Sequence, residues 1–287
     1  MRLFCFGLGY CALALARRLQ ARGWAVAGTC REESAQAGMA ERGIEAFLFQ
    51  RGRPLPEAAL AGATHLLSSI PPDAEGDPVL DLHAREIAAA RGLAWAGYLS
   101  TTGVYGDRAG GWVDEESELA PTGERGRRRV AAESGWRALA GSGVPIHIFR
   151  LAGIYGPGRS AFDALRQGRA QRIDKPGQVF GRIHVEDVAA ALEASMAKPR
   201  AGAIYNLADD DPAPPAEVVA YAAGLLGIAP PPLVPFAEAR LSPMALSFYR
   251  DSKRVRNDRI KRELGLRLAH PDYRAGLAAI LRAEQGR

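Results

Sequence analysis

The fold of this chain is decided by residues 1–31, which read MRLFCFGLGYCALALARRLQARGWAVAGTCR. Leu3–Phe6 is a short apolar run that is typical of a buried strand. Leu13–Leu19 carries apolar residues at helical spacing, with two arginines between them, and predicts a helix that covers a sheet. A second apolar run, Trp24–Thr29, predicts another strand. The stretch is therefore a strand, a glycine turn, a helix and a strand.

The turn between the first strand and the helix has the pattern G-x-G-x-x-A, formed by Gly7, Gly9 and Ala12. The first glycine permits a tight turn, and the second lets the backbone approach a pyrophosphate. Ala12 permits close packing of the helix on the strand, and the helix N-terminus attracts phosphate. We therefore predict a dinucleotide site that includes Tyr10 and Cys11, although a plain strand–helix turn remains the alternative.

The end of the second strand indicates which dinucleotide binds. A site that prefers NAD usually carries Asp or Glu about 20 residues after the glycines, where it binds the ribose hydroxyls. This chain has Cys30 and Arg31 there instead. A guanidinium is suited to a 2′-phosphate, so we predict NADP as the cofactor, with NAD as the alternative. Neutralisation of Arg31 by Glu32 and Glu33 would weaken that prediction.

Composition places the 287-residue chain among ordinary globular proteins, with 47% hydrophobic and 24% charged residues. We expect a cytoplasmic protein, because the sequence has neither a signal-peptide layout nor an apolar run long enough to cross a membrane. Cys5, Cys11 and Cys30 lack the spacing of a disulfide framework or a metal site, so we expect no metal. The net charge of +5 suits an anionic cofactor or substrate.

Apolar strands alternate with helices along the first hundred residues, and this pattern predicts an α/β fold with a doubly wound parallel sheet of the Rossmann type. The predicted later strands span residues 44–49, 64–70 and 95–100. Ligands bind at the carboxyl ends of such strands. We therefore expect Ser69 and Ile70, which end one of these strands, to face the cofactor.

Four later segments resemble motifs of the extended short-chain dehydrogenase/reductases, the NAD(P)-dependent epimerases and dehydratases. They are STTGVYG at 100–106, RLAGIYGPGR at 150–159, RIHVEDVA at 182–189 and IYNL at 204–207. Within that family the chain is most similar to an atypical bacterial branch. The resemblance implies that Ser100, Leu151 and Ile154 contribute to the cofactor site. It also implies a Rossmann domain over residues 1–157 and a small substrate lobe over 158–287, with 184–207 returning to the sheet.

The family's catalytic residues are a Ser or Thr, a Tyr and a Lys, and only the first is matched in this chain. Thr101 stands at the hydroxyl position. The expected Y-x-x-x-K is replaced by Arg125 and Arg129 when Ala131–Glu133 is aligned with the family's pattern. A guanidinium stays protonated at ordinary pH, so Arg125 is unable to transfer the proton that the Tyr would transfer. Arg129 keeps the positive charge of the Lys and is still suited to holding the cofactor.

Arg125, Arg128 and Arg129 share one face of the predicted helix. One interpretation is an anion site for NADP or an acidic substrate; the other is a solvated basic face, with Arg129 paired to Glu133 one turn later. We name Arg125, Arg159 and His184 as the candidate substrate contacts; Tyr105, Tyr155 and His184 are alternative proton donors.

These observations favour an NADP-binding oxidoreductase, similar to the epimerases, that acts on a small polar or anionic substrate such as a nucleotide-linked sugar. The alternative is a sensor or scaffold protein that binds NADP without catalysis, because the Tyr and Lys are missing. The basic run is short and is not interleaved with aromatic residues, so we do not expect nucleic acid as a partner. We expect no membrane partner, and a homodimer stays open.

Overall fold

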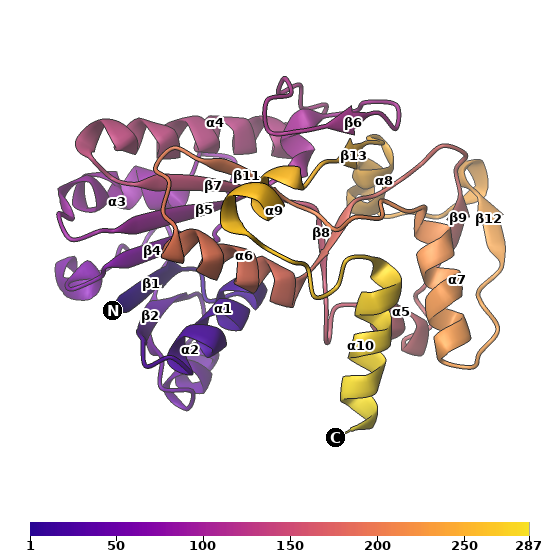
Figure 1. Cartoon of the computed structure of the whole chain (residues 1–287), viewed down its shortest axis with the longest axis horizontal. Coiled ribbons are helices and arrows are strands. Elements are labelled where there is room, and N and C mark those ends of the chain that lie inside the picture. Colours follow the sequence, from indigo (N-terminus) through magenta and orange to yellow (C-terminus); the bar gives the residue numbers. More distant parts are fainter. Residues whose placement is uncertain (287) are drawn as a thin grey trace.

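A seven-stranded parallel sheet runs through the centre of the molecule in the computed structural model, which describes residues 1–286 (Figure 1). The strand order is β11-β7-β5-β4-β1-β2-β3. The strands are β1 (Arg2–Phe6), β2 (Ala25–Cys30), β3 (Glu45–Leu48), β4 (His65–Ser68), β5 (Trp95–Thr101), β7 (Ile146–Leu151) and β11 (Ile204–Leu207). The order reverses between β1 and β4, which is the feature that defines a doubly wound sheet. The predicted fold class is confirmed.

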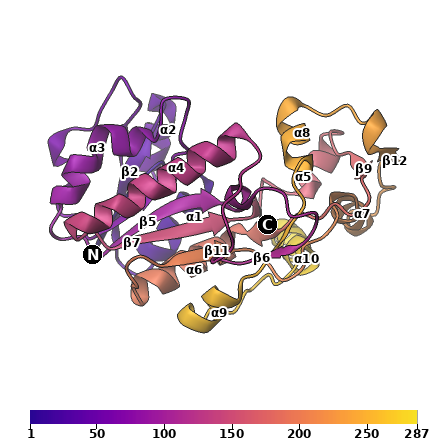
Figure 2. The same ribbon diagram turned by 90° about the horizontal axis from the view of Figure 1, so that it is seen from above.

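Helices cover both faces of the sheet (Figures 1 and 2). One buried cluster joins the sheet to α1 (Tyr10–Gln20), α2 (Glu33–Ala40), α6 (Val185–Ala197) and α9 (Asp258–Leu264). A second cluster lies against α3 (Pro78–Ala89) and α4 (Glu124–Ala138). There the indole ring of Trp136 stacks on Tyr98 of β5, with ring centroids 5.5 Å apart. With both faces buried, the strands need continuous apolar runs, which is why Leu3–Phe6 is entirely inaccessible to solvent.

Parts of the segments between β7 and β11 and after β11, apart from α6 and α9, build a smaller lobe beside the sheet (Figure 1). Its helices are α5 (Ala161–Arg166), α7 (Pro215–Leu225), α8 (Pro243–Tyr249) and α10 (Tyr273–Gln285). Phe162, Tyr273 and Leu277 form much of the buried cluster that joins α5, α7 and α10. In Figure 1 the C-terminus lies at the end of α10, on the lobe side, and the N-terminus lies at the start of β1, at the end of the strands away from the lobe.

Residues 172–184 contain two short strands that lie outside the main sheet. β9 (Arg172–Asp174) pairs in parallel with β12 (Leu233–Pro235). β10 (Arg182–His184) pairs with β8 (Gly153–Tyr155), the strand that leaves the main sheet after β7. Strands of three residues that pair over such sequence separations leave no alternating pattern, so sequence periodicity missed them.

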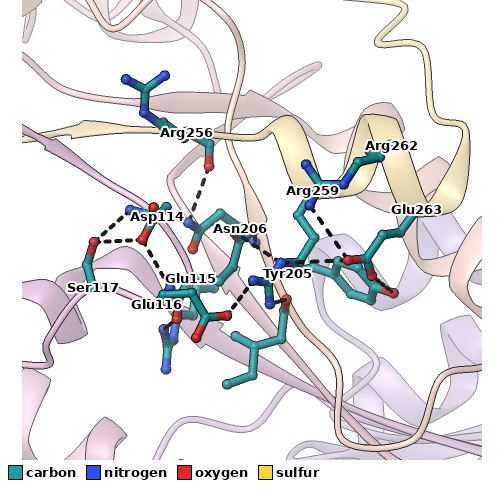
Figure 3. Close-up of polar contacts among 12 residues, drawn as sticks. Asp114, Glu115, Glu116, Ser117, Tyr205, Asn206, Arg256, Arg259, Arg262 and Glu263 are labelled. Atoms are coloured by element: carbon teal, nitrogen blue, oxygen red, sulfur yellow. Dashed lines mark hydrogen bonds and ion pairs between the residues drawn. The ribbon is translucent and has the colours of Figure 1, made fainter.

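The outer edge of β11 is covered by polar side chains (Figure 3). The backbone N–H of Asn206 donates to Glu115 Oε1 at 2.8 Å, and Asn206 Nδ2 donates to the carbonyl of Arg256. Arg259 of α9 forms ion pairs with Glu115, Glu116 and Glu263. Glu115 follows β6 (Trp112–Val113), which pairs with β13 (Arg254–Val255). This cover satisfies backbone groups that an open edge strand would present to other chains.

Within residues 1–286, the helices are too short or too polar to cross a lipid bilayer.

Candidate cofactor and substrate site

The tight turn after β1 depends on the backbone conformation of Gly7. Its φ is +88°, a left-handed conformation that residues with a Cβ rarely adopt. A Cβ at this position would lie 2.8 Å from Ser69 Oγ and 3.0 Å from Ile70 Cγ1. The Ser69 hydroxyl donates to the Gly7 carbonyl at 2.7 Å. The ends of β1 and β4 therefore meet at Gly7, which brings Ser69 and Ile70 beside the glycine turn.

The first turn of α1 presents free backbone donors. Gly9 is the residue that precedes the helix, with φ −90°, and a Cβ built on it would meet no atom within 4 Å. No side chain caps this end of α1, and the first turn has no acidic residue. Among the described residues, the N–H groups of Tyr10, Cys11 and Ala12 have no hydrogen-bond acceptor. Open space before three free donors fits a pyrophosphate group.

Arg31 lies exposed at the end of β2, one residue beyond Cys30. Glu32 and Glu33, the residues that would weaken its role by neutralising it, are also exposed. No ion pair between Arg31 and a carboxylate is found within residues 1–286. The guanidinium is therefore free to meet an anion from solvent at the edge of the sheet where β2 ends.

Ser100 belongs to a buried polar network at the end of β5. Its hydroxyl donates to Glu133 Oε1 at 2.5 Å. The Glu133 carboxylate also accepts hydrogen bonds from Nε and Nη2 of Arg150. Arg150 also donates to the phenol oxygen of Tyr105, whose hydroxyl donates to Asn206 Oδ1 at 2.7 Å. The network ties the ends of β5, β7 and β11 to α4. Glu133 is thus occupied by Arg150, and the alternative pairing of Glu133 with Arg129 is wrong.

Arg129 is turned toward the sheet. Its Nη1 donates to the carbonyl of Leu99 in β5 at 2.5 Å, and its Cζ lies 5.7 Å from the centroid of the Tyr98 ring. The side chain is partly buried, whereas that of Arg125 is exposed. Arg129 therefore holds α4 against β5 at the carboxyl end of the sheet.

Arg125 lies at the start of α4, beside the segment that follows Thr101. Gly126, its neighbour, packs against the carbonyl of Gly103. The guanidinium of Arg125 lies 5.7 Å from the ring centroid of Phe248 in α8, so it faces a helix of the lobe. Arg128 pairs with Glu124 and does not join Arg125 and Arg129 in a single cluster. The Thr101 hydroxyl accepts the Gly103 N–H and keeps its own proton to donate.

Comparison with known proteins places the chain in a family. The model of the NAD dependent epimerase/dehydratase family matches residues 79–208. Protein YeeZ of Escherichia coli strain K12 is 31% identical over 281 residues, which cover 93% of this chain and 95% of that protein. The chain belongs to the NAD-dependent epimerase/dehydratase family.

Two solved structures extend the comparison. A functionally unknown conserved protein from Silicibacter pomeroyi is 53% identical, with a TM-score of 0.93 and 98% coverage of both chains. A dTDP-glucose 4,6-dehydratase from Bacillus anthracis, in complex with NAD, is 15% identical, with a TM-score of 0.77. That alignment covers 100% of this chain and 97% of the dehydratase, and it shows a shared fold.

The two tyrosines proposed as alternative proton donors are buried in this epimerase/dehydratase chain. Tyr105 is fully buried within the Arg150 network, and burial raises its pKa to about 12. The hydroxyl of Tyr155 donates to the carbonyl of Asp272 at 3.2 Å, and burial raises the pKa of Tyr155 far above its ordinary value. Both phenols therefore stabilise the fold by joining segments that are distant in sequence.

His184 begins α6 and is 3% exposed. Its Nδ1 accepts the N–H of Glu186, and burial, together with the nearby His270, lowers its pKa to about 4. His184, Asp187 and His270 bring potential ligand atoms within 4.8 Å of one another. Both Asp187 oxygens, however, already accept hydrogen bonds from the 269–270 segment. This arrangement is that of a helix cap and a chain anchor, and the absence of a metal site stays a prediction.

A groove of about 460 Å³ lies in the lobe. Its lining contains three cations, Arg172, Lys175 and Arg254, and two carboxylates, Asp174 and Glu217. The start of α7 and Leu233 of β12 form further walls. Lys175 donates to the carbonyl of Tyr249 in α8, the helix whose Phe248 faces Arg125. The sequence does not reveal this groove, because the residues that line it are spread over positions 172–254 and share no pattern.

Proposed function

We propose that this epimerase/dehydratase family member binds NADP in preference to NAD. The observation that carries the proposal is the exposed Arg31 at the end of β2, without a carboxylate partner within the described residues. A dinucleotide placed along the glycine turn has its adenosine ribose at this strand end. A guanidinium there binds a 2′-phosphate through paired N–H groups, whereas NAD offers it only hydroxyls.

The geometry of the strand ends supports a position for the rest of the cofactor in this proposal. The N–H groups of residues 10–12 bind the pyrophosphate, and the bare Cα of Gly9 leaves room for it. Ser69 and Ile70 lie beside Gly7 and border the cofactor. Ser100, Leu151 and Ile154 line the nicotinamide end, with Arg129 holding the strand beneath it. The bound nicotinamide supplies hydride transfer.

The substrate of this proposal is small and anionic, in the manner of a nucleotide-linked sugar. Arg125 is exposed at the start of α4 and faces Phe248, so its N–H groups remain available to a carboxylate or phosphate. The groove of the lobe, whose lining has three cations and two carboxylates, is large enough for a further polar part of the same molecule. Thr101 donates a hydrogen bond to the substrate oxygen at the reacting carbon. The reaction of this proposal is of the oxidoreductase or epimerase type.

The proposal is tested by titrating the purified chain with NADPH and NADH by calorimetry. Wild-type protein is expected to bind NADPH about 10- to 100-fold more tightly than NADH, the range expected for one or two charge-assisted hydrogen bonds. Arg31→Ala is expected to abolish that preference by weakening NADPH alone. Arg42→Ala is the matched control, because Arg42 is also exposed but precedes β3 at the opposite end of the strands. Equal affinities in the wild type would overturn the NADP assignment.

A second candidate function is binding of NADP without catalysis, as in a sensor or scaffold. One reason to favour it is that Arg129 holds β5 through the Leu99 carbonyl. A second reason is that Tyr105 and Tyr155 are both buried, so neither of these two candidate tyrosines is free to donate a proton. Incubation of the NADP⁺ complex with a panel of nucleotide-linked sugars separates the two. Reduction of NADP⁺ or conversion of the sugar supports the enzyme, and tight binding with neither change supports the sensor.

A further inference from the structure

The segment 156–159 crosses the start of α1 as a tight reverse turn. It follows β8, and two backbone hydrogen bonds close it, from Gly156 N to the Arg159 carbonyl at 3.1 Å and from Arg159 N to the Gly156 carbonyl at 3.0 Å. The turn leads directly into α5, which begins at Ala161. It is therefore the first piece of the lobe, and it lies against the glycine turn of the sheet domain.

Tyr10 fixes this turn in place. Its hydroxyl donates to the carbonyl of Pro157 at 3.0 Å, although the two residues are 147 positions apart. A Cβ on Gly156 would lie only 2.5 Å from the Tyr10 hydroxyl oxygen and 2.7 Å from Val185 Cγ1. Glycine is thus required at 156 for the phenol to approach, and the position of the turn relative to α1 is well defined.

This turn places Arg159 beside Tyr10, the first residue of α1. Its Cζ lies 5.8 Å from the centroid of the Tyr10 ring, and its side chain is exposed. Among residues 1–286, no carboxylate forms an ion pair with Arg159. Its charge partly opposes the effect of burial on two residues of the helix start, because it lowers the pKa values of Tyr10 and Cys11, which burial raises.

A cation in this position is electrostatically unfavourable in the free protein. The N-terminus of an α-helix carries a partial positive charge, which favours acidic neighbours and disfavours arginine. Here Arg159 adds a full positive charge, the first turn has no acid, and the N–H groups of Tyr10, Cys11 and Ala12 have no described acceptor. A bound anion would relieve this concentration of positive charge and accept from the free donors.

We propose that Arg159 binds the pyrophosphate of the dinucleotide rather than the substrate. This inference rests on the proposed cofactor site, and it adds a contact supplied from outside the sheet domain. Because the pyrophosphate is common to NADP and NAD, Arg159 contributes equally to both, whereas Arg31 distinguishes them. The turn that carries Arg159 also begins the lobe, so occupation of the cofactor site stabilises the position of α5.

The test compares Arg159→Gln with the wild type in calorimetric titrations with NADPH and with NADH. Loss of a charge-assisted contact is expected to weaken both complexes by about 10- to 100-fold and to leave their ratio unchanged. Arg169→Gln is the matched control, because Arg169 is exposed in the same lobe and hydrogen-bonds only to Gln167 through its side chain. The control is expected to bind both nucleotides as the wild type does.

The remaining outcomes contradict the inference in distinguishable ways. Unchanged binding of both nucleotides by Arg159→Gln would overturn the role of Arg159 and leave the NADP proposal intact. Selective loss of NADPH would place Arg159 at the 2′-phosphate instead of the pyrophosphate, and would also overturn it. A wild-type protein that binds neither nucleotide would overturn both proposals at once.

Discussion

Gly7 and Gly9 stand two residues apart in the turn before α1, and the structure gives them different reasons to be glycine. Gly7 has a left-handed backbone and touches Ser69 and Ile70, so a side chain there would disturb the protein itself. Gly9 has φ −90° and open space in front of it, so a side chain there would meet only a ligand. One glycine serves the fold, and the other serves binding.

This difference makes the pair a test of the turn. Gly7→Ala is expected to lower the free energy of unfolding by about 1–3 kcal/mol, because the new Cβ enforces backbone strain and contact with Ser69. Gly9→Ala is expected to leave stability unchanged and to weaken binding of NADPH and NADH alike. Urea unfolding and calorimetric titration measure the two effects. Normal nucleotide binding by Gly9→Ala would contradict the placement of the pyrophosphate.

At the scale of elements, the connection from α9 to α10 depends on one buried carboxylate. Asp187 of α6 is 1% exposed, and its oxygens accept the N–H groups of Ala269 and His270 at 2.7 and 3.0 Å. The ring Nδ1 of His270 lies 3.1 Å from the same carboxylate. Residues 265–272 are thereby fastened to a helix of the sheet domain before the chain enters α10.

Removing that carboxylate is expected to release the connection. Asp187→Ala removes the acceptor of two partly buried N–H groups, which costs about 1–3 kcal/mol of unfolding free energy. Limited proteolysis is expected to show new cleavage within residues 265–272. The matched control is Asp211→Ala, which removes an exposed ion pair with Arg274 and is expected to change neither readout. Equal protease resistance of Asp187→Ala and wild type would show that other contacts hold the connection.

At the scale of the whole molecule, sequence patterns predicted the sheet but not the contacts that join distant segments of the chain. The glycine turn and the alternation of strands and helices predicted the doubly wound sheet because both are local signals. Pairing of Arg129 with Glu133 was also inferred locally, from their spacing, and it failed because Arg150 of β7 takes Glu133. Tyr10 and Pro157 meet across 147 positions, a separation at which no periodic pattern connects two residues.

The junction between the sheet and the lobe contains a carboxyl group that makes stability depend on pH. Asp209 follows β11, is 2% exposed, and neither of its carboxyl oxygens has a hydrogen-bond partner within the described residues. Burial raises its pKa to about 8, although Arg182 acts in the opposite direction. The folded protein therefore keeps a proton that the unfolded chain releases near pH 4, and stability falls as the pH rises from about 4 to 8.

Asp209→Asn removes this titration. Between pH 5 and pH 8 the wild type is expected to lose about 2–4 kcal/mol of unfolding free energy relative to the variant, and the difference levels off about one pH unit above the folded pKa. Urea unfolding of both proteins across the pH series measures the difference. Parallel pH profiles would show that the Asp209 carboxyl is ionised in the folded protein.

The late position of β11 in the chain has a consequence for synthesis. β7 ends at Leu151, but its outer neighbour spans Ile204–Leu207, and the cover over β11 requires Arg259. A ribosome needs several seconds to add the intervening residues. During that time the emerging sheet has an unpaired apolar edge. Co-translational folding of this protein is therefore exposed to association between nascent chains until the second half has been made.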